Sequence, residues 1–191
     1  MNPTFHRVIG EAAEIRQFEP RHAEMVFGVV ERNRQYLREW LPWVDQTKSS
    51  HEIREFILRA QSQYHSNQGP NAGIWVEGEF AGSIGCHKID WINRSCSIGY
   101  WIDARYQGRG IVTTCCESLL DYLFHEMGLH RVVIQCGTGN AKSGAIPKRL
   151  GFTREGVSRD AEWVNDRWID LVVWSMLENE WRPAAENPPT E

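Results

Sequence analysis

Residues 95–120, SCSIGYWIDARYQGRGIVTTCCESLL, change their apolar periodicity halfway along the stretch. From Cys96 to Ile102 every second residue is apolar, and this period of two predicts a β-strand. From Val112 to Met127 apolar residues recur three and four positions apart, which predicts an amphipathic helix, and Gly128 stands where helices commonly end. The seven residues RYQGRGI at 105–111 therefore connect a strand to a helix.

The segments around this stretch predict the rest of the sheet. HRVVIQCG at 130–137 predicts a strand, so the strand–helix–strand unit of residues 94–136 predicts a parallel pair with a right-handed crossover. Three strand-like runs with turns between them fill residues 72–103 and predict an antiparallel meander. A first strand is predicted at 13–20, and a terminal hairpin at 152–177 that turns at Asn165-Asp166. We therefore expect a mixed α/β sheet.

Three further segments have helical patterns. Residues 21–43 predict two helical pieces, which Pro42 ends. Residues 49–69 carry apolar residues at helical spacing after a serine cap, which is either Ser49 or Ser50. Asn140 is expected to begin a short helix.

Composition restricts the class of protein. The 191 residues are 41% apolar and 24% charged, values typical of a globular protein, and predict a single domain over residues 1–181 with a disordered tail at 182–191. The net charge of −4, without a basic block, argues against a nucleic-acid partner. The chain has no apolar run long enough to cross a membrane and no signal-peptide core, so we expect a cytoplasmic protein. The five cysteines form no CxxC pair and are expected to be reduced core residues.

The loop at 105–111 suits an anion, although its glycines alone are weak evidence. A loop that opens a helix leaves backbone N–H groups without partners, and the helix dipole favours negative charge there. Gly108 and Gly110 would let the backbone approach a ligand closely. The loop lacks the lysine of a P-loop, and Thr113 replaces the third glycine of a dinucleotide fingerprint. Taken alone, the two glycines fit a plain turn better than a phosphate cradle.

The wider pattern resembles a known family. Arg105-x-x-Gly108-x-Gly110 is similar to the R/Q-x-x-G-x-G/A signature of the GCN5-related N-acetyltransferases (GNAT), and Asn140, Ser143 and Gly151-Phe152 are similar to the family's next marker. The order of elements matches over roughly residues 10–178. The segments NRQYLREWLPW, IGYWID, YQGRGI and AEWVNDRWID resemble the RimJ/RimL branch, whose members acetylate α-amino groups of ribosomal proteins.

The resemblance implies a fold, a cosubstrate and a cofactor site. The implied fold is a mixed, largely antiparallel sheet of about seven strands with one parallel pair, flanked by four to five helices. The cosubstrate is acetyl-coenzyme A, with no metal, and related enzymes are often homodimers. Backbone amides of the loop would hold the pyrophosphate, so the N–H of Arg109 matters more than its side chain. The residues expected to bind the cofactor are Trp101, Ile102, Arg105, Gln107, Gly108, Arg109, Gly110, Ile111, Val112 and Asn140.

The same resemblance assigns catalytic and acceptor-binding residues. Glu162 would activate the amine through a water molecule, and Ser143 would protonate the leaving thiolate. Without the resemblance, the sequence favours a solvated strand residue for Glu162. Ser143 could instead be a helix cap or a ligand contact without proton transfer, and Asn140 only an N-cap. Trp40 and Trp43 would border the acceptor groove, or else close the helices against the sheet. Pro147 lies inside the short helix after Asn140, which leaves the placement of Ser143 open.

Other chemistry fits the sequence less well. His125, Glu126 and His130 do not have the i, i+4 spacing of a helical zinc motif, and Cys115-Cys116 lie on the apolar stripe of the predicted helix. The expected function is acetyl transfer to the N-terminal α-amine of a protein by direct attack. Two alternatives stay open: an acetyltransferase for small amines or antibiotics, and a non-catalytic module that binds acyl-coenzyme A.

Overall fold

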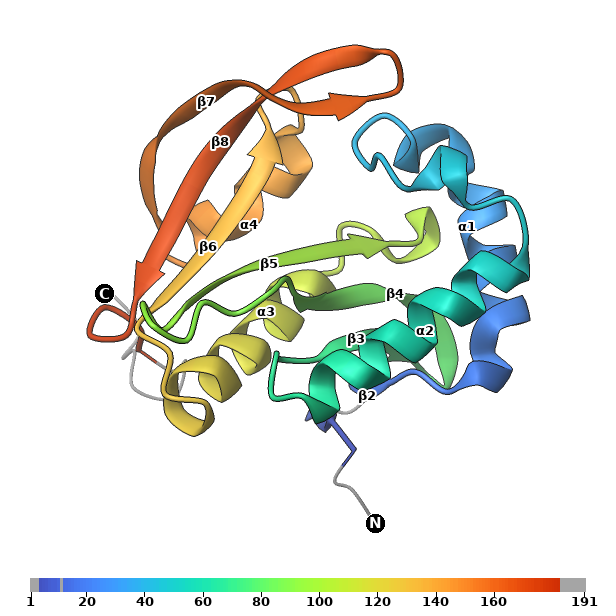
Figure 1. Cartoon of the computed structure of the whole chain (residues 1–191), viewed down its shortest axis with the longest axis horizontal. Helices are drawn as coiled ribbons and strands as arrows, with labels where there is room; N and C mark the ends of the chain where they lie inside the picture. The colour runs from blue at the N-terminus through green and yellow to red at the C-terminus, as the bar shows by residue number, and fades with distance from the viewer. Residues whose placement is uncertain (1–3, 11, 183–191) are drawn as a thin grey trace.

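The computed structural model describes residues 4–10 and 12–182. One sheet contains all eight named strands: β1 (His6–Ile9), β2 (Ala13–Gln17), β3 (Asn71–Val76), β4 (Glu79–Cys86), β5 (Ser95–Ile102), β6 (Arg131–Gly137), β7 (Thr153–Val164) and β8 (Arg167–Leu177). Their order across the sheet is β1-β2-β3-β4-β5-β6-β8-β7 (Figure 1). The pairing of β5 with β6 is parallel and the other neighbouring pairs are antiparallel, which confirms the predicted mixed sheet.

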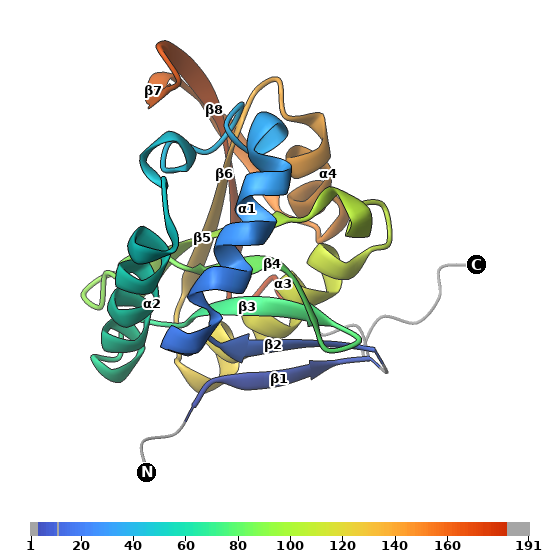
Figure 2. The same cartoon turned by 90° about the vertical axis from the view of Figure 1, so that its right-hand side faces the viewer.

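Four α-helices cover the two faces of the sheet (Figure 2). Helices α1 (Ala23–Leu37) and α2 (Ser50–His65) pack on one face, around a cluster that includes Phe18, Trp75 and Phe80. Helix α3 (Ile111–Asp121) packs on the other face of the same strands and forms the larger core cluster with them. Helix α4 (Ala141–Arg149) follows β6 and packs against it.

Helix boundaries follow local hydrogen bonds. Ser49 caps α2, because its hydroxyl accepts from the N–H of His51 at 3.2 Å and its own N–H donates to Glu52 at 2.8 Å. Regular helix α1 ends at Leu37, so Pro42 lies in the turn that follows and does not itself end the helix. The predicted helix up to Met127 is observed as α3 followed by one wider π turn, and it ends at Gly128 with φ of 67°.

Strands β5 and β6 separate halfway along their length (Figure 1). Their parallel pairing runs from Ser95 with Arg131 to Ile98 with Ile134 and stops there. Beyond that point β5 continues along β4, and β6 continues along β8. Each strand therefore has a free edge of backbone N–H and C=O groups that faces the gap between them.

Strand β1 was not predicted, which is why eight strands replace the expected seven or so, and the first strand predicted at 13–20 is observed as β2. β1 has only four residues and pairs with β2 alone at the edge of the sheet, so its sequence lacks a clear alternation. All five cysteines are buried with free thiols, as predicted. Among the residues that the structure describes, every helix is too short or too polar to span a bilayer. The predicted tail lies outside the described residues, apart from Arg182.

Candidate active site

The loop between β5 and α3 forms an open cradle of backbone amides. Gly108 and Gly110 have φ of 74° and 76°, a left-handed conformation that favours glycine. Gly110 is the N-cap residue of α3, and its neighbour Arg109 is exposed. In the described part of the chain, the N–H groups of residues 108–110 have no hydrogen-bond partner. A Cβ added at either glycine would meet nothing within 4 Å, so no other residue crowds the loop at these two positions.

Asp103 fixes the start of this loop. Its side chain is only 1% exposed and accepts from the N–H of Arg105 at 3.1 Å, while Arg32 of α1 donates to it at 2.9 and 2.6 Å. Burial by itself would raise the pKa of Asp103, but hydrogen bonds from Arg105 and Arg32 hold that pKa below its usual value. The carboxylate therefore stays charged and links the loop to α1.

Basic side chains lie beside the cradle. Lys142 of α4 donates to the Gln107 side chain at 3.0 Å, and Arg149 donates to the Thr113 hydroxyl at 2.7 Å. These two bonds join α4 to the loop and to the first turn of α3. The guanidinium of Arg109 lies 5.3 Å from the ring centre of Tyr106, so its side chain packs on the loop itself.

The two predicted β5 residues lie at the free end of that strand. Trp101 faces the α1 and α2 side, with its ring centre 6.1 Å from that of Trp43. The carbonyl of Ile102 accepts a hydrogen bond from the hydroxyl of Tyr36. Burial is the main reason why the pKa of Tyr36 rises to about 12, so its hydroxyl keeps its proton and remains a donor.

Helix α4 places Asn140 and Ser143 at the gap. Asn140 caps the helix, because its Oδ1 accepts from the N–H of Ser143 at 3.1 Å. Ser143 is therefore not the cap, and Pro147 lies in the second turn of the helix rather than in the first. Ser143 lies four residues before Pro147, and proline has no N–H to donate to the Ser143 carbonyl. This carbonyl instead accepts a hydrogen bond from the hydroxyl of Tyr100 at 3.1 Å. This bond connects α4 to β5 across the gap.

The hydroxyl of Ser143 lies beside two other polar groups. Its Oγ is 3.5 Å from the hydroxyl of Tyr100, whose pKa is raised, chiefly by burial. Cys136 of β6 is also buried next to α4, and this burial raises the pKa of its thiol, although Trp174 and Ser143 act in the opposite direction. A hollow of about 340 Å³ opens on this side of α4 and is lined by Cys136, Gly137, Thr138, Asn140, Ala141, Gly144, Ala145, Lys148, Val172 and Trp174.

The terminal hairpin carries Glu162 past a β-bulge. The predicted turn is confirmed: Val164 pairs with Arg167, and both turn residues between them have positive φ. The register shifts between Ser158 and Glu162, where Asp160 has φ of 47° and donates its N–H to Asp170 at 2.9 Å. A bulge bends the strand and re-aims the side chains after it. The bulge therefore determines where the Glu162 side chain points.

Glu162 is a half-buried carboxyl group without a partner. Within the described residues it forms neither a hydrogen bond nor an ion pair, and its burial raises its pKa above the usual value. It pairs across the hairpin with Ile169, so the two side chains share a face of the sheet. A Cβ added to Gly137 would lie 3.4 Å from the Ile169 side chain, so Ile169 covers the face of β6 toward which Gly137 points. Cys136, the residue before Gly137 in the same strand, points to the opposite face. Glu162 and Ser143 therefore approach the gap from opposite faces.

Trp40 lies on the same face as Glu162. A Cβ at Gly137 would be 2.8 Å from the Trp40 ring, and one at Gly139 would be 3.0 Å away. The indole therefore rests on glycine backbone at the end of β6. Arg167 of the hairpin lies over the same ring, with 5.8 Å from its guanidinium to the ring centre. Trp40 thus fits both the predicted groove and the alternative of closing the helices, whereas Trp43 packs chiefly against Trp101 and the core below it.

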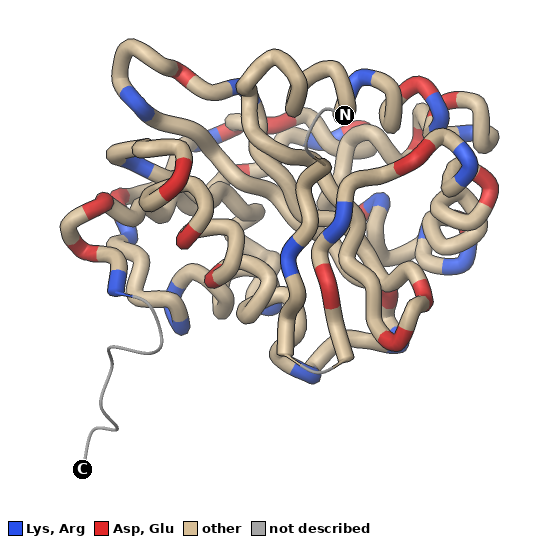
Figure 3. The backbone as a smooth tube through the Cα atoms, turned by 90° about the horizontal axis from the view of Figure 1, so that it is seen from below, with Lys and Arg blue, Asp and Glu red and all other residues tan. Residues whose placement is uncertain are grey.

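Charge is distributed without a concentrated metal-binding centre. Among the described residues there is no group of three or more His, Cys, Asp or Glu side chains placed to hold a metal ion. Figure 3 shows basic and acidic positions interspersed along the backbone. The arrangement therefore offers an anion cradle, a strand gap and a lone carboxyl group.

Comparison with known proteins identifies the family. Residues 13–153 match the family model described as "Acetyltransferase (GNAT) domain". The chain belongs to the GNAT family of acetyltransferases, and this confirms the family, the fold and the enzyme class predicted from the sequence.

Its relatives include ribosomal-protein acetyltransferases of the RimL type. The chain is 39% identical over 174 residues to the "Putative ribosomal N-acetyltransferase YdaF" of Bacillus subtilis, which covers 91% of this chain and 95% of the relative. It is 25% identical to the ribosomal-protein-serine acetyltransferase of Escherichia coli, over 88% of this chain and 94% of that protein. A solved structure of RimL, the ribosomal L7/L12 alpha-N-protein acetyltransferase in complex with coenzyme A, has a TM-score of 0.87 and 25% identity, over 91% of this chain and 98% of that one.

Sequence reasoning missed three parts of this site. Asp103 follows directly after the strand and precedes the glycine loop, and an acidic residue at this position is a signal that could have been used. Tyr100 looked like one more apolar residue in the alternation, although its hydroxyl reaches Ser143. The bulge at Asp160 had no signal, because no glycine or proline stands there.

Proposed function

We propose that this protein transfers the acetyl group of acetyl-coenzyme A to the N-terminal α-amino group of a protein, with a ribosomal protein as the acceptor. The observation that carries the proposal is the gap between β5 and β6, with the amide cradle at one end and Glu162 on the opposite face. A cytoplasmic setting fits the five free thiols. We expect no nucleic-acid or membrane partner.

The residues present fit the cofactor. The unpaired N–H groups of residues 108–110 and the start of α3 suit a diphosphate, with Arg105, Gln107, Ile111 and Val112 around them. The free edges of β5 and β6 suit an extended arm that carries amide groups, because such an arm can pair like an added strand. Asn140 has its Oδ1 engaged as a cap, which leaves its side-chain NH₂ for the arm.

The proposed reaction is direct attack of the amine on the thioester. An α-amine with a pKa of about 8 is partly neutral near pH 7, whereas a lysine with a pKa of about 10.4 is almost fully charged. Glu162, whose pKa is raised by burial, takes a proton from the amine through water. A backbone N–H on the free edge of β5 stabilises the developing oxyanion, and the Ser143 hydroxyl supplies a proton to the leaving thiolate.

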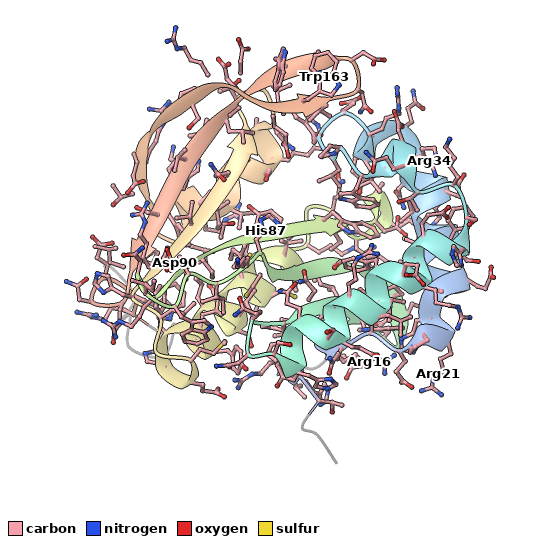
Figure 4. All side chains as sticks on the ribbon, in the orientation of Figure 1. Arg16, Arg21, Arg34, His87, Asp90 and Trp163 are labelled. Atoms are coloured by element: carbon pink, nitrogen blue, oxygen red, sulfur yellow. The ribbon has the colours of Figure 1, made fainter. Side chains whose placement is uncertain are left out.

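We further propose that the protein is a homodimer. Trp163 lies near the tip of the hairpin (Figure 4). Trp163 and its cross-strand partner Trp168 are 50% and 58% exposed, and their ring centres lie 5.1 Å apart. Exposed aromatic side chains are enriched at protein interfaces. Sedimentation of the purified protein would show a single species of one-chain mass if this part of the proposal is wrong.

The acceptor is tested by measuring thiol release from acetyl-coenzyme A with three kinds of amine. The panel contains a serine-starting peptide, the same peptide with its α-amine blocked and one lysine added, and a set of small polyamines and aminoglycosides. We expect turnover on the free α-amine, and little on the blocked peptide. Turnover confined to small amines would replace the ribosomal acceptor with a small-molecule one, and cofactor binding without any turnover would favour a binding module.

A further inference from the structure

The imidazole of His87 lies over the point where β5 leaves β6 (Figure 4). His87 follows the last residue of β4, and the last parallel pair is Ile98 with Ile134, so Gly99 is the first β5 residue with a free edge. A Cβ placed on Gly99 would lie 3.4 Å from Nε2 of His87 and 3.8 Å from its Cε1. The ring therefore fills the space above Gly99 that a side chain would otherwise take.

The two nitrogens of the His87 ring differ in their hydrogen bonding. Nδ1 lies 3.0 Å from the hydroxyl of Ser97, which is two residues before Gly99 and on the same face of β5. Among the described residues, Nε2 has no hydrogen-bond partner, and His87 is exposed to solvent at one side. If Nδ1 carries the proton and donates to Ser97, the lone pair of Nε2 is free. Partial burial of the ring lowers the pKa of His87, so the neutral form prevails near pH 7.

Tyr100, the residue after Gly99, shows on which face of β5 the His87 ring lies. The Tyr100 side chain points to the face opposite to His87, where its hydroxyl contacts Ser143. His87 therefore lies on the face of β5 that Trp101 shares, away from α3 and α4. Glu162 also lies on the face away from α4. An amine that enters from this side meets Nε2 at the free edge of β5.

We propose that His87, oriented by Ser97, is a second proton acceptor for the attacking amine, and this inference rests on the proposed function. A cationic α-amine must lose two protons before it becomes an amide. Glu162 takes the first through water before attack. As the N–C bond forms and the C–S bond breaks, the second N–H bond breaks and its proton passes to Nε2 and then to solvent. The thiolate takes up one proton, so one proton is released in total.

The test uses a substitution that keeps the size of the side chain without its basicity. His87→Gln should lower kcat on the serine-starting peptide by about 100-fold, the lower end of the range for a general base, with the peptide KM and the Kd for coenzyme A within about threefold. Ser97→Ala should have a smaller effect in the same direction, because the ring remains but is no longer oriented. Lys88→Ala, a change at the neighbouring exposed residue, should leave all three constants unchanged.

Chemical rescue separates proton transfer from structural support. Free imidazole in the assay should restore part of the activity of His87→Ala and none of that of a Glu162→Gln protein. An unchanged kcat for His87→Gln, or a loss of coenzyme A affinity that parallels the loss of rate, would overturn the proposed role of His87 alone. If the wild-type protein binds coenzyme A and turns over no acceptor in the panel, the proposed function itself fails, and the role of His87 fails with it.

Discussion

The two halves of the sheet differ sharply in burial. In β3 and β4 every residue after the first is buried, because α1 and α2 cover one face and α3 covers the other. In β7 and β8 most residues are exposed or half-buried, because α4 covers one face only. The first half is thus a packed core, and the second half is a surface that can present side chains such as Glu162. The gap proposed as the active site lies where these two halves separate.

The largest expected effect comes from matched truncations in the two halves. Ile84 in β4 is 1% exposed and Val157 in β7 is 42% exposed. Ile84→Ala should lower the free energy of unfolding by roughly 2–4 kcal/mol, because it removes buried methyl groups and leaves a cavity. Val157→Ala should change it by less than about 0.5 kcal/mol. Urea unfolding of both variants measures this, and equal losses would show that the two halves do not differ as described.

Glu162→Gln should affect the reaction and leave the fold intact. We expect kcat to fall by about 100-fold, since the group no longer accepts a proton, with little change in unfolding free energy. Burial raises the pKa of Glu162, so in the wild type the rate should fall as the pH drops through this raised pKa and the carboxylate is protonated. The variant should lack this limb of the pH profile.

The control for Glu162 lies on the same hairpin. Asp166 is an exposed turn residue with φ of 64°, a conformation that asparagine tolerates. Asp166→Asn should keep the wild-type rate and pH profile. A similar loss of rate in both variants would indicate that the hairpin as a whole, and not the carboxyl group of Glu162, supports the reaction.

The smallest expected effect tests the link between the two halves. The Tyr100 hydroxyl donates to Ser143 at 3.1 Å in a partly buried setting, and the Tyr106 hydroxyl donates to Glu79 at 3.0 Å on the surface. Tyr100→Phe should cost about 1 kcal/mol of unfolding free energy and Tyr106→Phe clearly less, because only the first change leaves a partly buried carbonyl without its partner. Thermal unfolding of the pair measures the difference, and a larger loss for Tyr106→Phe would contradict it.

The sequence was most informative where local patterns decide the structure. The change of period around the loop predicted β5, α3 and the parallel pair, and Asn165-Asp166 predicted the hairpin turn. These features depend on residues close together in the chain. β1 escaped prediction because a four-residue edge strand is fixed by its partner β2 rather than by its own pattern.

The site was less predictable because its parts meet through tertiary contacts. The family resemblance selected Glu162 and Ser143 as site residues, and these roles stay predictions. Nothing in the sequence near His87 indicates that its ring rests on Gly99, since the contact depends on the turn that joins β4 to β5. The link from Asp103 to Arg32 joins residues 71 positions apart and is likewise invisible to local patterns.

Pro147 has a consequence for how the gap is kept open. Because this residue cannot donate to the carbonyl of Ser143, α4 uses that carbonyl to hold β5 through Tyr100. This bond ties β5 to α4, the helix that follows β6, in the protein without a ligand. A ligand arm that fits the existing gap loses less conformational entropy on binding than one that must first separate the strands. A residue that weakens its own helix thus adds a contact across the proposed binding gap.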